Sequence, residues 1–199
     1  MSTCTKDHGE RRDECRDTRR IVALLFDLGD TLMSEESEVK DAEGTTLRAD
    51  LLPGAAEALR RFKEQGHTLA LVADARPETP ANVLRQHGLY DLFDYLAISE
   101  IIGVEKPDPL IFRTALKALG IPESDYGRVV MVGNNLERDV VGANRLSLIS
   151  IFLHWNDRRR SQPLTAEERP RYTVSSIQDL VSLVASFNNS ETCEALEPR

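Results

Sequence analysis

The sequence predicts an α/β domain in which helices cover both faces of a mostly parallel sheet. Short apolar runs alternate with helical patterns along most of the chain, which is typical of strands joined by helical crossovers. The runs are continuous, as expected for strands that are buried on both faces. With 199 residues, of which 41% are hydrophobic, the chain is long enough to bury one substantial core.

The strands and helices can be placed in order from these runs and from the residues that end them. Strands are predicted at residues 21–26, 68–73, 95–98, 129–132 and 148–153. Helices are predicted at about residues 53–65, 79–87, 107–119, 138–145 and 177–187. Pro53 stands at the first turn of the first helix, and Gly66, Gly88 and Gly120 follow the ends of three helices. The alternation predicts a Rossmann-like three-layer sandwich spanning residues 21–187.

The two ends of the chain differ from this domain in composition. Residues 1–20 mix charges of both signs with almost no apolar residues, so we expect a disordered N-terminal extension. We expect residues 188–199 to form a disordered tail for the same reason. Cys4, Cys15 and Cys193 lie in these polar ends and match neither a disulfide framework nor a zinc spacing, which favours a reducing cytoplasm.

The composition also argues against several classes of partner. A net charge of −8 disfavours nucleic acid and anionic membrane surfaces. No apolar run approaches the roughly 18 residues that a membrane span needs. The charged N-terminus lacks the apolar region of a signal peptide. We therefore expect a cytoplasmic protein with neither a nucleic-acid nor a membrane partner.

Polar residues follow four of the predicted strands, at the edge of a parallel sheet where ligands bind. Asp27 follows the first strand, Asp74 the second, Lys106 the third and Asp139 the fourth. Each has an ordinary explanation when taken alone: a turn or capping aspartate, a surface lysine, or an acidic residue near a helix start. A carboxylate beside a buried strand needs a cation or a donor, however. We therefore predict that Asp27, Lys106 and Asp139 gather into a cation-dependent site that handles an anion.

Three motifs carry a family resemblance by their order and spacing. Asp-x-x-Asp-Thr-Leu begins at Asp27, and Lys-Pro-Asp-Pro begins at Lys106. Gly-Asn-x-x-x-x-Asp ends at Asp139 and is followed by Gly-Ala-Asn at residues 142–144. Over residues 21–187 the chain resembles the haloacid dehalogenase-like hydrolase superfamily, as a member with a minimal cap.

The resemblance implies a Mg²⁺-dependent hydrolase, specifically a phosphatase that cleaves a phosphate monoester through an aspartyl-phosphate. By this similarity Asp27 is the nucleophile, and Lys106 neutralises it and the transferring group. Thr31 would contact phosphate oxygens. The implied ligands of Mg²⁺, which prefers such hard oxygen donors, are Asp27, the backbone carbonyl of Gly29, Asn134 and Asp139.

The first motif departs from the usual phosphatase pattern at Gly29. Phosphatases of this family carry a second aspartate there, which acts as the general acid and base. Loss of such a group typically costs about 10²–10⁴-fold in rate. Asp30, and in second place Asp74, are the candidates to replace it.

Two further departures concern phosphate and metal binding. Ala73 stands where the family has a serine or threonine donor, so Arg76 is either a replacement anion ligand or an ordinary loop residue. Asp74 is a second candidate substrate contact. Asn134 replaces an acidic residue of the third matched motif, which implies weaker Mg²⁺ binding because one negative charge is lost.

Residues 33–52 occupy the place where many relatives insert a helical cap domain. This segment is only about twenty residues long, so we expect a flap or short hairpin and an open site. An open site admits a small phosphate ester or a bulkier substrate, unless a second subunit of a homo-oligomer covers it. Arg158, Arg159 and Arg160 follow Trp155 after the last predicted strand. They favour a surface charge cluster, with an anion-attracting loop as the alternative.

Two other functions also fit the sequence. The departures at Gly29, Ala73 and Asn134 also fit a binding or regulatory protein that has kept the fold and lost turnover. A dehalogenase-type hydrolase would need neither the second aspartate nor a metal. Such relatives carry a larger cap and an aromatic residue at the position of Gly29.

Overall fold

A computed structural model describes residues 21–188 of the chain, with side chains up to residue 187. The predicted extension at residues 1–20 lies outside this range. So does the predicted tail, except Asn188, which ends the last helix. Within the described residues, no helix is both long and apolar enough to cross a membrane.

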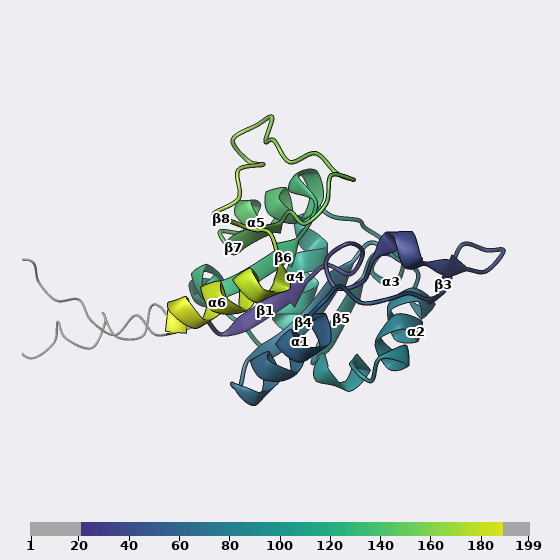
Figure 1. The fold of residues 1–199 in the computed structure, drawn as a ribbon. Helices are drawn as coiled ribbons and strands as arrows, with labels where there is room; N and C mark the ends of the chain where they lie inside the picture. The colour runs from purple at the N-terminus through teal and green to yellow at the C-terminus, as the bar shows by residue number, and fades with distance from the viewer. Residues whose placement is uncertain (1–20, 189–199) are drawn as a thin grey trace, which may run out of the picture.

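The core is a sheet of six strands in which every neighbouring pair is parallel (Figure 1). Across the sheet the strands are β5 (Tyr95–Ile98), β4 (Thr68–Ala73), β1 (Ala23–Phe26), β6 (Val129–Gly133), β7 (Ile149–Leu153) and β8 (Tyr172–Val174). The predicted parallel α/β fold is confirmed. β8, a three-residue edge strand, was not predicted.

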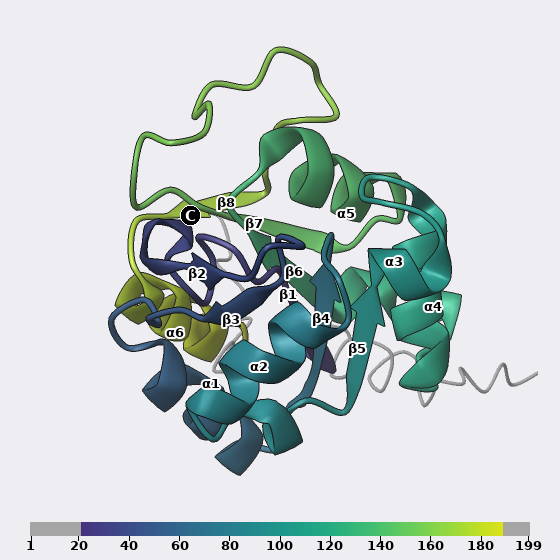
Figure 2. The same cartoon turned by 90° about the vertical axis from the view of Figure 1, so that its right-hand side faces the viewer.

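Alternate residues of the strands face two separate helical layers. In β1, Leu24 and Phe26 pack on one side of the sheet, and Ala23 and Leu25 on the other. The first layer holds α1 (Ala55–Glu64), α2 (Glu78–Gln86) and α6 (Ile177–Asn188) (Figure 2). The second holds α4 (Pro109–Ala118) and α5 (Val141–Arg145). The strands are therefore buried on both faces, which explains their continuous apolar sequence.

The order of the strands places a crevice at the carboxyl end of β1. From β1 the chain adds β4 and β5 on one side, and then returns to add β6, β7 and β8 on the other. Ligands of open α/β sheets bind at such a reversal of strand order. The segments that follow β1, β4 and β6 meet there. The remaining short elements are η1 (Glu35–Ser37), η2 (Tyr90–Leu92), α3 (Ser99–Ile102), η3 (Glu123–Arg128) and the π-turn η4 (Leu136–Val140).

The segment for which we predicted a flap, residues 33–52, contains η1 and an antiparallel hairpin of β2 (Val39–Lys40) and β3 (Thr46–Arg48). Hydrogen bonds tie the returning half of the hairpin to α2 and the residue after it. Thr46 N donates to Thr79 Oγ1 at 3.1 Å, and Asn82 Nδ2 donates to the carbonyl of Thr46 at 3.0 Å. His87 Nε2 lies 2.8 Å from the carbonyl of Ala49. The hairpin is thus anchored to the main domain at several points along its length.

Candidate active site

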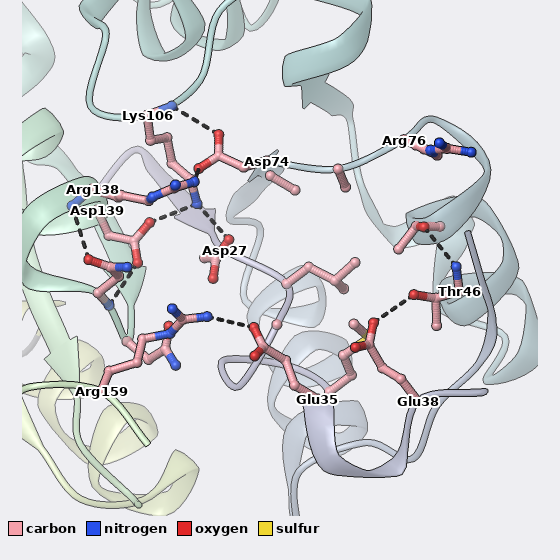
Figure 3. A pocket seen from close by; sticks show the side chains of 18 of the residues that line it. Asp27, Glu35, Glu38, Thr46, Asp74, Arg76, Lys106, Arg138, Asp139 and Arg159 are labelled. Carbon is pink, nitrogen blue, oxygen red and sulfur yellow. Dashed lines mark hydrogen bonds and ion pairs between the residues drawn. The ribbon is translucent and has the colours of Figure 1, made fainter. Parts of the chain in front are cut away.

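Asp27, Lys106 and Asp139 meet at the carboxyl end of the sheet, in the crevice beside β1 (Figure 3). Lys106 Nζ lies 2.5 Å from Asp27 Oδ1 and 2.7 Å from Asp139 Oδ1. The side chains of Lys106 and Asp139 are almost fully buried, whereas that of Asp27 is 14% exposed. The backbone N–H of Asp27 donates to the carbonyl of Val132 on β6, which fixes the end of β1 against its neighbour. The structure therefore brings together the three residues on which the predicted site depends.

The turn after β6 positions the carboxylate of Asp139. Its Oδ2 accepts a hydrogen bond of 3.0 Å from the backbone N–H of Asn135. A Cβ atom at Gly133 would overlap the carboxyl group of Asp139, so a side chain there would push the carboxylate out of place. Glycine at position 133 is therefore required by the close approach of Asp139 to the strand.

Asp74 positions the loop that carries Lys106. Asp74 Oδ1 accepts a 2.9 Å hydrogen bond from the backbone N–H of Lys106, and Oδ2 accepts a 2.9 Å bond from Arg138 Nη1. Arg138 also approaches Glu105 at 3.2 Å. Both oxygens of Asp74 are thus engaged with protein groups, although the residue lines the same cavity as Asp27.

Two carboxyl groups share one ammonium group in this cluster, so it carries an excess negative charge when both are ionised. Burial raises the pKa of Asp139 to about 7; the nearby Lys106 opposes this rise and Asp27 adds to it. Burial alone would lower the pKa of Lys106, but the charges of Asp139 and Asp27 outweigh it and raise the pKa above its usual range. The cluster therefore keeps its lysine charged and favours a further positive charge nearby.

The groups around Asp27 suit a hard cation. The side-chain oxygen of Asn134 is buried, lies at the cavity and has no hydrogen-bond partner among the described residues. A buried orphaned oxygen is costly unless a donor or a cation meets it. The described residues contain no group of three or more His, Cys, Asp or Glu side chains able to hold a metal ion. A site here would combine two carboxylates with amide and backbone oxygens, a set that suits Mg²⁺ with retained waters.

A polar cavity of about 420 Å³ opens beside the cluster. Asp27, Gly29, Asn134 and the positively charged Arg76 line it, as do side chains from the flap. Arg76 Nη1 lies 3.4 Å from the hydroxyl of Thr45, at the limit of a hydrogen bond. Arg76 is therefore close enough to the cavity to meet an anion there.

Asp30 and Thr31 do not line this cavity. Asp30 is fully buried in a left-handed turn (φ 48°), and its carboxylate accepts from the backbone N–H of Glu35 at 2.9 Å. Its other oxygen lies 3.4 Å from Arg158 Nη1. Thr31 is also buried, with its hydroxyl 3.5 Å from Asp27 Oδ2. The turn thus directs the carboxylate of Asp30 away from the cavity. A substitute general acid and base would have to face the cavity beside Asp27, so the structure does not place Asp30 for that role.

Two residues that line the cavity, Glu35 and Arg159, were not among the predicted site residues. Arg159 Nη2 lies 2.7 Å from Glu35 Oε1 (Figure 3), and Arg158 Nη1 lies 3.6 Å from Glu35 Oε2. Trp155 Nε1 donates to the backbone carbonyl of Asp30 at 2.7 Å. Arg160 pairs instead with Glu137 and Glu168. The run of Arg158 and Arg159 therefore braces the turn after β1 and the flap, and does not form an isolated surface cluster. Its position directly after a strand was the available clue.

Comparisons with known proteins agree with this arrangement. Residues 44–146 match the family model of the haloacid dehalogenase-like hydrolases. The chain is 27% identical over 140 residues to a glyceraldehyde 3-phosphate phosphatase of Pyrococcus furiosus, which covers 70% of this chain and 57% of that protein. It is 33% identical over 133 residues to a pyrimidine 5′-nucleotidase of Escherichia coli, covering 67% and 56%. The chain thus spans little more than half the length of these relatives.

Solved structures show the same fold. A protein of Listeria monocytogenes serotype 4b superposes with a TM-score of 0.67 at 27% identity, covering 84% of this chain and 99% of that one. The resemblance inferred from the three motifs is thereby confirmed. The matched family model covers just over half of the 199 residues, and the chain belongs to the haloacid dehalogenase-like hydrolase family.

Proposed function

We propose that the protein is a Mg²⁺-dependent phosphatase that hydrolyses a phosphate monoester through an aspartyl-phosphate on Asp27. The observation that carries the proposal is the environment of Asp27. One carboxyl oxygen contacts Lys106 Nζ at 2.5 Å. Within residues 21–187, the other has a single long contact, with the hydroxyl of Thr31 at 3.5 Å. That second oxygen is free to attack a phosphorus atom in the cavity.

Each neighbouring group has a role that follows from its position. The ammonium of Lys106 holds Asp27 in place and offsets negative charge as the phosphoryl group is transferred. Asp139 orients that ammonium, and Asp74 holds the loop from which it extends. We assign Asp74 this positioning role rather than direct contact with substrate. Arg76 remains the proposed anion ligand on the opposite wall.

The proposed metal ligands are Asp27, the backbone carbonyl of Gly29, the orphaned oxygen of Asn134 and Asp139. A bound Mg²⁺ ion would supply positive charge against the phosphate oxygens in this cluster. The excess negative charge of the cluster favours such an ion. Asn134 favours it too, because its buried side-chain oxygen has no hydrogen-bond partner among the described residues.

The substrate class follows from the cavity and the relatives. A polar cavity of about 420 Å³ with several positively charged side chains suits a small, hydrophilic phosphate ester. The relatives are named for glyceraldehyde 3-phosphate and pyrimidine 5′-nucleotides, and phosphoserine is named for a third, from Thermus thermophilus. These compounds form the natural starting panel.

The test is phosphate release by the purified full chain from this panel and from p-nitrophenyl phosphate, with Mg²⁺ or with a chelator. We expect release only with Mg²⁺ and a loss of more than about 10³-fold in Asp27→Asn, because the nucleophile is gone. Asp91→Asn, an exposed aspartate on η2, makes the same chemical change away from the cavity and should retain full activity.

Three results would refute the proposal, each in a different direction. Equal rates in wild type and Asp27→Asn would show that the release does not come from this site. Tight Mg²⁺ binding without turnover on any ester would instead identify a binding protein. The departures from the family's motifs at Gly29 and Asn134 would then reflect a loss of catalysis. Halide release from a haloacid without Mg²⁺ would support a dehalogenase.

A further inference from the structure

Glu35 of the flap occupies the space into which a side chain at position 29 would project. A Cβ atom built on Gly29 would collide with Glu35 Oε1 and lie 3.1 Å from both Cδ and Cγ of that residue. The backbone at Gly29 is not left-handed, so the chain conformation does not demand glycine there. Glycine at position 29 is explained by the carboxylate of Glu35, which fills the place beside it.

Three contacts hold Glu35 in this place. Oε1 accepts from Arg159 Nη2 at 2.7 Å, and Oε2 lies 3.6 Å from Arg158 Nη1. The backbone N–H of Glu35 donates to the buried carboxylate of Asp30 at 2.9 Å. The Glu35 side chain nevertheless remains 31% exposed, and its carboxylate extends from the flap into the cavity that Asp27 lines (Figure 3). It is therefore a positioned carboxylate that a bound substrate can reach.

The other carboxylates near the cavity are already engaged. Asp30 is fully buried and does not line the cavity. Both oxygens of Asp74 accept hydrogen bonds, from the backbone of Lys106 and from Arg138. Both oxygens of Glu38 contact other side chains of the hairpin. Glu35 is paired with Arg159 through Oε1, but its Oε2 has the longer contact of 3.6 Å with Arg158. Glu35 is thus better placed than these three to exchange a proton with a substrate beside Asp27.

We infer that Glu35 of the flap is the proton-transfer residue of the reaction, in place of the aspartate that position 29 lacks. The inference rests on the proposed phosphatase function. Asp27 attacks the phosphorus atom, the bond from phosphorus to the ester oxygen breaks, and the protonated carboxyl of Glu35 gives its proton to that leaving oxygen. Water then attacks the aspartyl-phosphate and passes a proton back to Glu35. The bond between phosphorus and Asp27 breaks, inorganic phosphate leaves, and both carboxyl groups return to their starting states.

The first experiment compares Glu35→Gln with Glu36→Gln, which makes the same change at the exposed neighbour on η1. With p-nitrophenyl phosphate and Mg²⁺, we expect Glu35→Gln to lower kcat by about 10²–10⁴-fold with little change in KM. p-Nitrophenolate needs little protonation to leave. Rapid quenching of Glu35→Gln should therefore show a burst of it, approaching one equivalent per chain, with phosphate trapped on Asp27. An alkyl phosphate should give no such burst. Glu36→Gln should behave as the wild type.

The second experiment moves the carboxylate from the flap to position 29. Gly29→Asp alone should displace the Glu35 side chain, because the new side chain collides with it. The double variant Gly29→Asp/Glu35→Ala should be at least about tenfold faster than Glu35→Ala alone, since the carboxylate again stands beside Asp27. A purely structural role for Glu35 predicts no such rescue.

Several outcomes would overturn the inference. Equal kcat in the Glu35→Gln and Glu36→Gln variants would do so, as would a loss in Glu35→Gln that appears only in KM. A loss of kcat without trapped phosphate and without rescue by Gly29→Asp would reduce Glu35 to a residue that holds the flap. These results leave Asp27-dependent hydrolysis by the wild type intact. The absence of any such hydrolysis overturns the proposed function and this inference together.

Discussion

Two charged clusters face the same cavity and are built in opposite ways. The strand-end cluster, Asp27, Lys106 and Asp139, has side chains that are 14%, 2% and 1% exposed. The flap cluster, Glu35, Arg158 and Arg159, has side chains that are 31%, 41% and 38% exposed. The strand-end charges are enclosed, so each must be matched by its partners, because an unpaired buried charge is very costly. The pair of Glu35 and Arg159 is more exposed and should therefore contribute little to stability. Arg158 differs, because it also contacts the buried carboxylate of Asp30.

The largest expected effect is on stability, from removing the shared cation of the strand-end cluster. Lys106→Met leaves two carboxylates without their ammonium and should lower the free energy of unfolding by about 3–5 kcal/mol. Lys63→Met breaks a partly exposed pair with Asp94 and should cost less than about 1 kcal/mol. Urea unfolding of the two variants measures the difference. If the two variants lose equal amounts of unfolding free energy, burial does not make the strand-end cluster more important for stability than an exposed ion pair.

A pair of glycine substitutions compares the clusters more finely. An alanine at position 133 meets the carboxyl group of Asp139, which Lys106 and Asn135 hold in place, and should cost about 1–3 kcal/mol. An alanine at position 29 meets the end of the Glu35 side chain, which can swing toward solvent, so it should cost less. The comparison fails if Gly29→Ala proves the more destabilising in thermal unfolding. Gly127→Ala, whose Cβ would meet nothing within 4 Å, is the control.

Metal binding should respond to the charge of the strand-end cluster. Asn134→Asp restores a negative charge at the orphaned oxygen and should tighten Mg²⁺ binding by about tenfold, or about 1.4 kcal/mol. Asn135→Asp adds the same charge at a residue whose side chain caps the next turn, so its effect should be smaller. Titration calorimetry with MgCl₂ measures both. Unchanged binding in Asn134→Asp would remove residue 134 from the proposed ligands.

The smallest stability effect is expected in the flap cluster. Arg159→Gln removes the 2.7 Å contact to Glu35, yet should change the free energy of unfolding by less than about 1 kcal/mol. Its kcat should fall severalfold, because Glu35 loses the partner that positions it. Arg48→Gln, on the exposed hairpin strand β3, should leave both quantities unchanged. A large loss of stability in Arg159→Gln would show that the flap cluster behaves like the buried one.

The sequence predicted most of the sheet and the strand-end cluster because both follow from local patterns. Continuous apolar runs marked five of the six strands, and the fold brings the residues after parallel strands together. β8 escaped prediction because it has only three residues and lies at the edge of the sheet, with a half-buried tyrosine and an exposed threonine.

The flap cluster could not be predicted in the same way. Glu35 and Arg159 are 124 residues apart. They lie in the short helix η1 and in a loop, where no periodicity indicates which way a side chain points. Asp30 was expected to substitute for the missing aspartate, but a single left-handed residue turns its carboxylate into the protein. The direction of one side chain at a turn depends on tertiary contacts, here with Arg158 and with the Glu35 backbone.

The anchoring of the hairpin to α2 has a consequence for how molecules enter the cavity. A lid that closes over each substrate must break and remake its contacts in every cycle. Here Thr46, Ala49 and the residues of α2 that bind them would have to part, at the loss of several hydrogen bonds. For the proposed phosphatase, we therefore expect substrates to enter and leave past a wall that stays in place. The width and charge of the cavity mouth, and not the opening of a lid, would then select among phosphate esters.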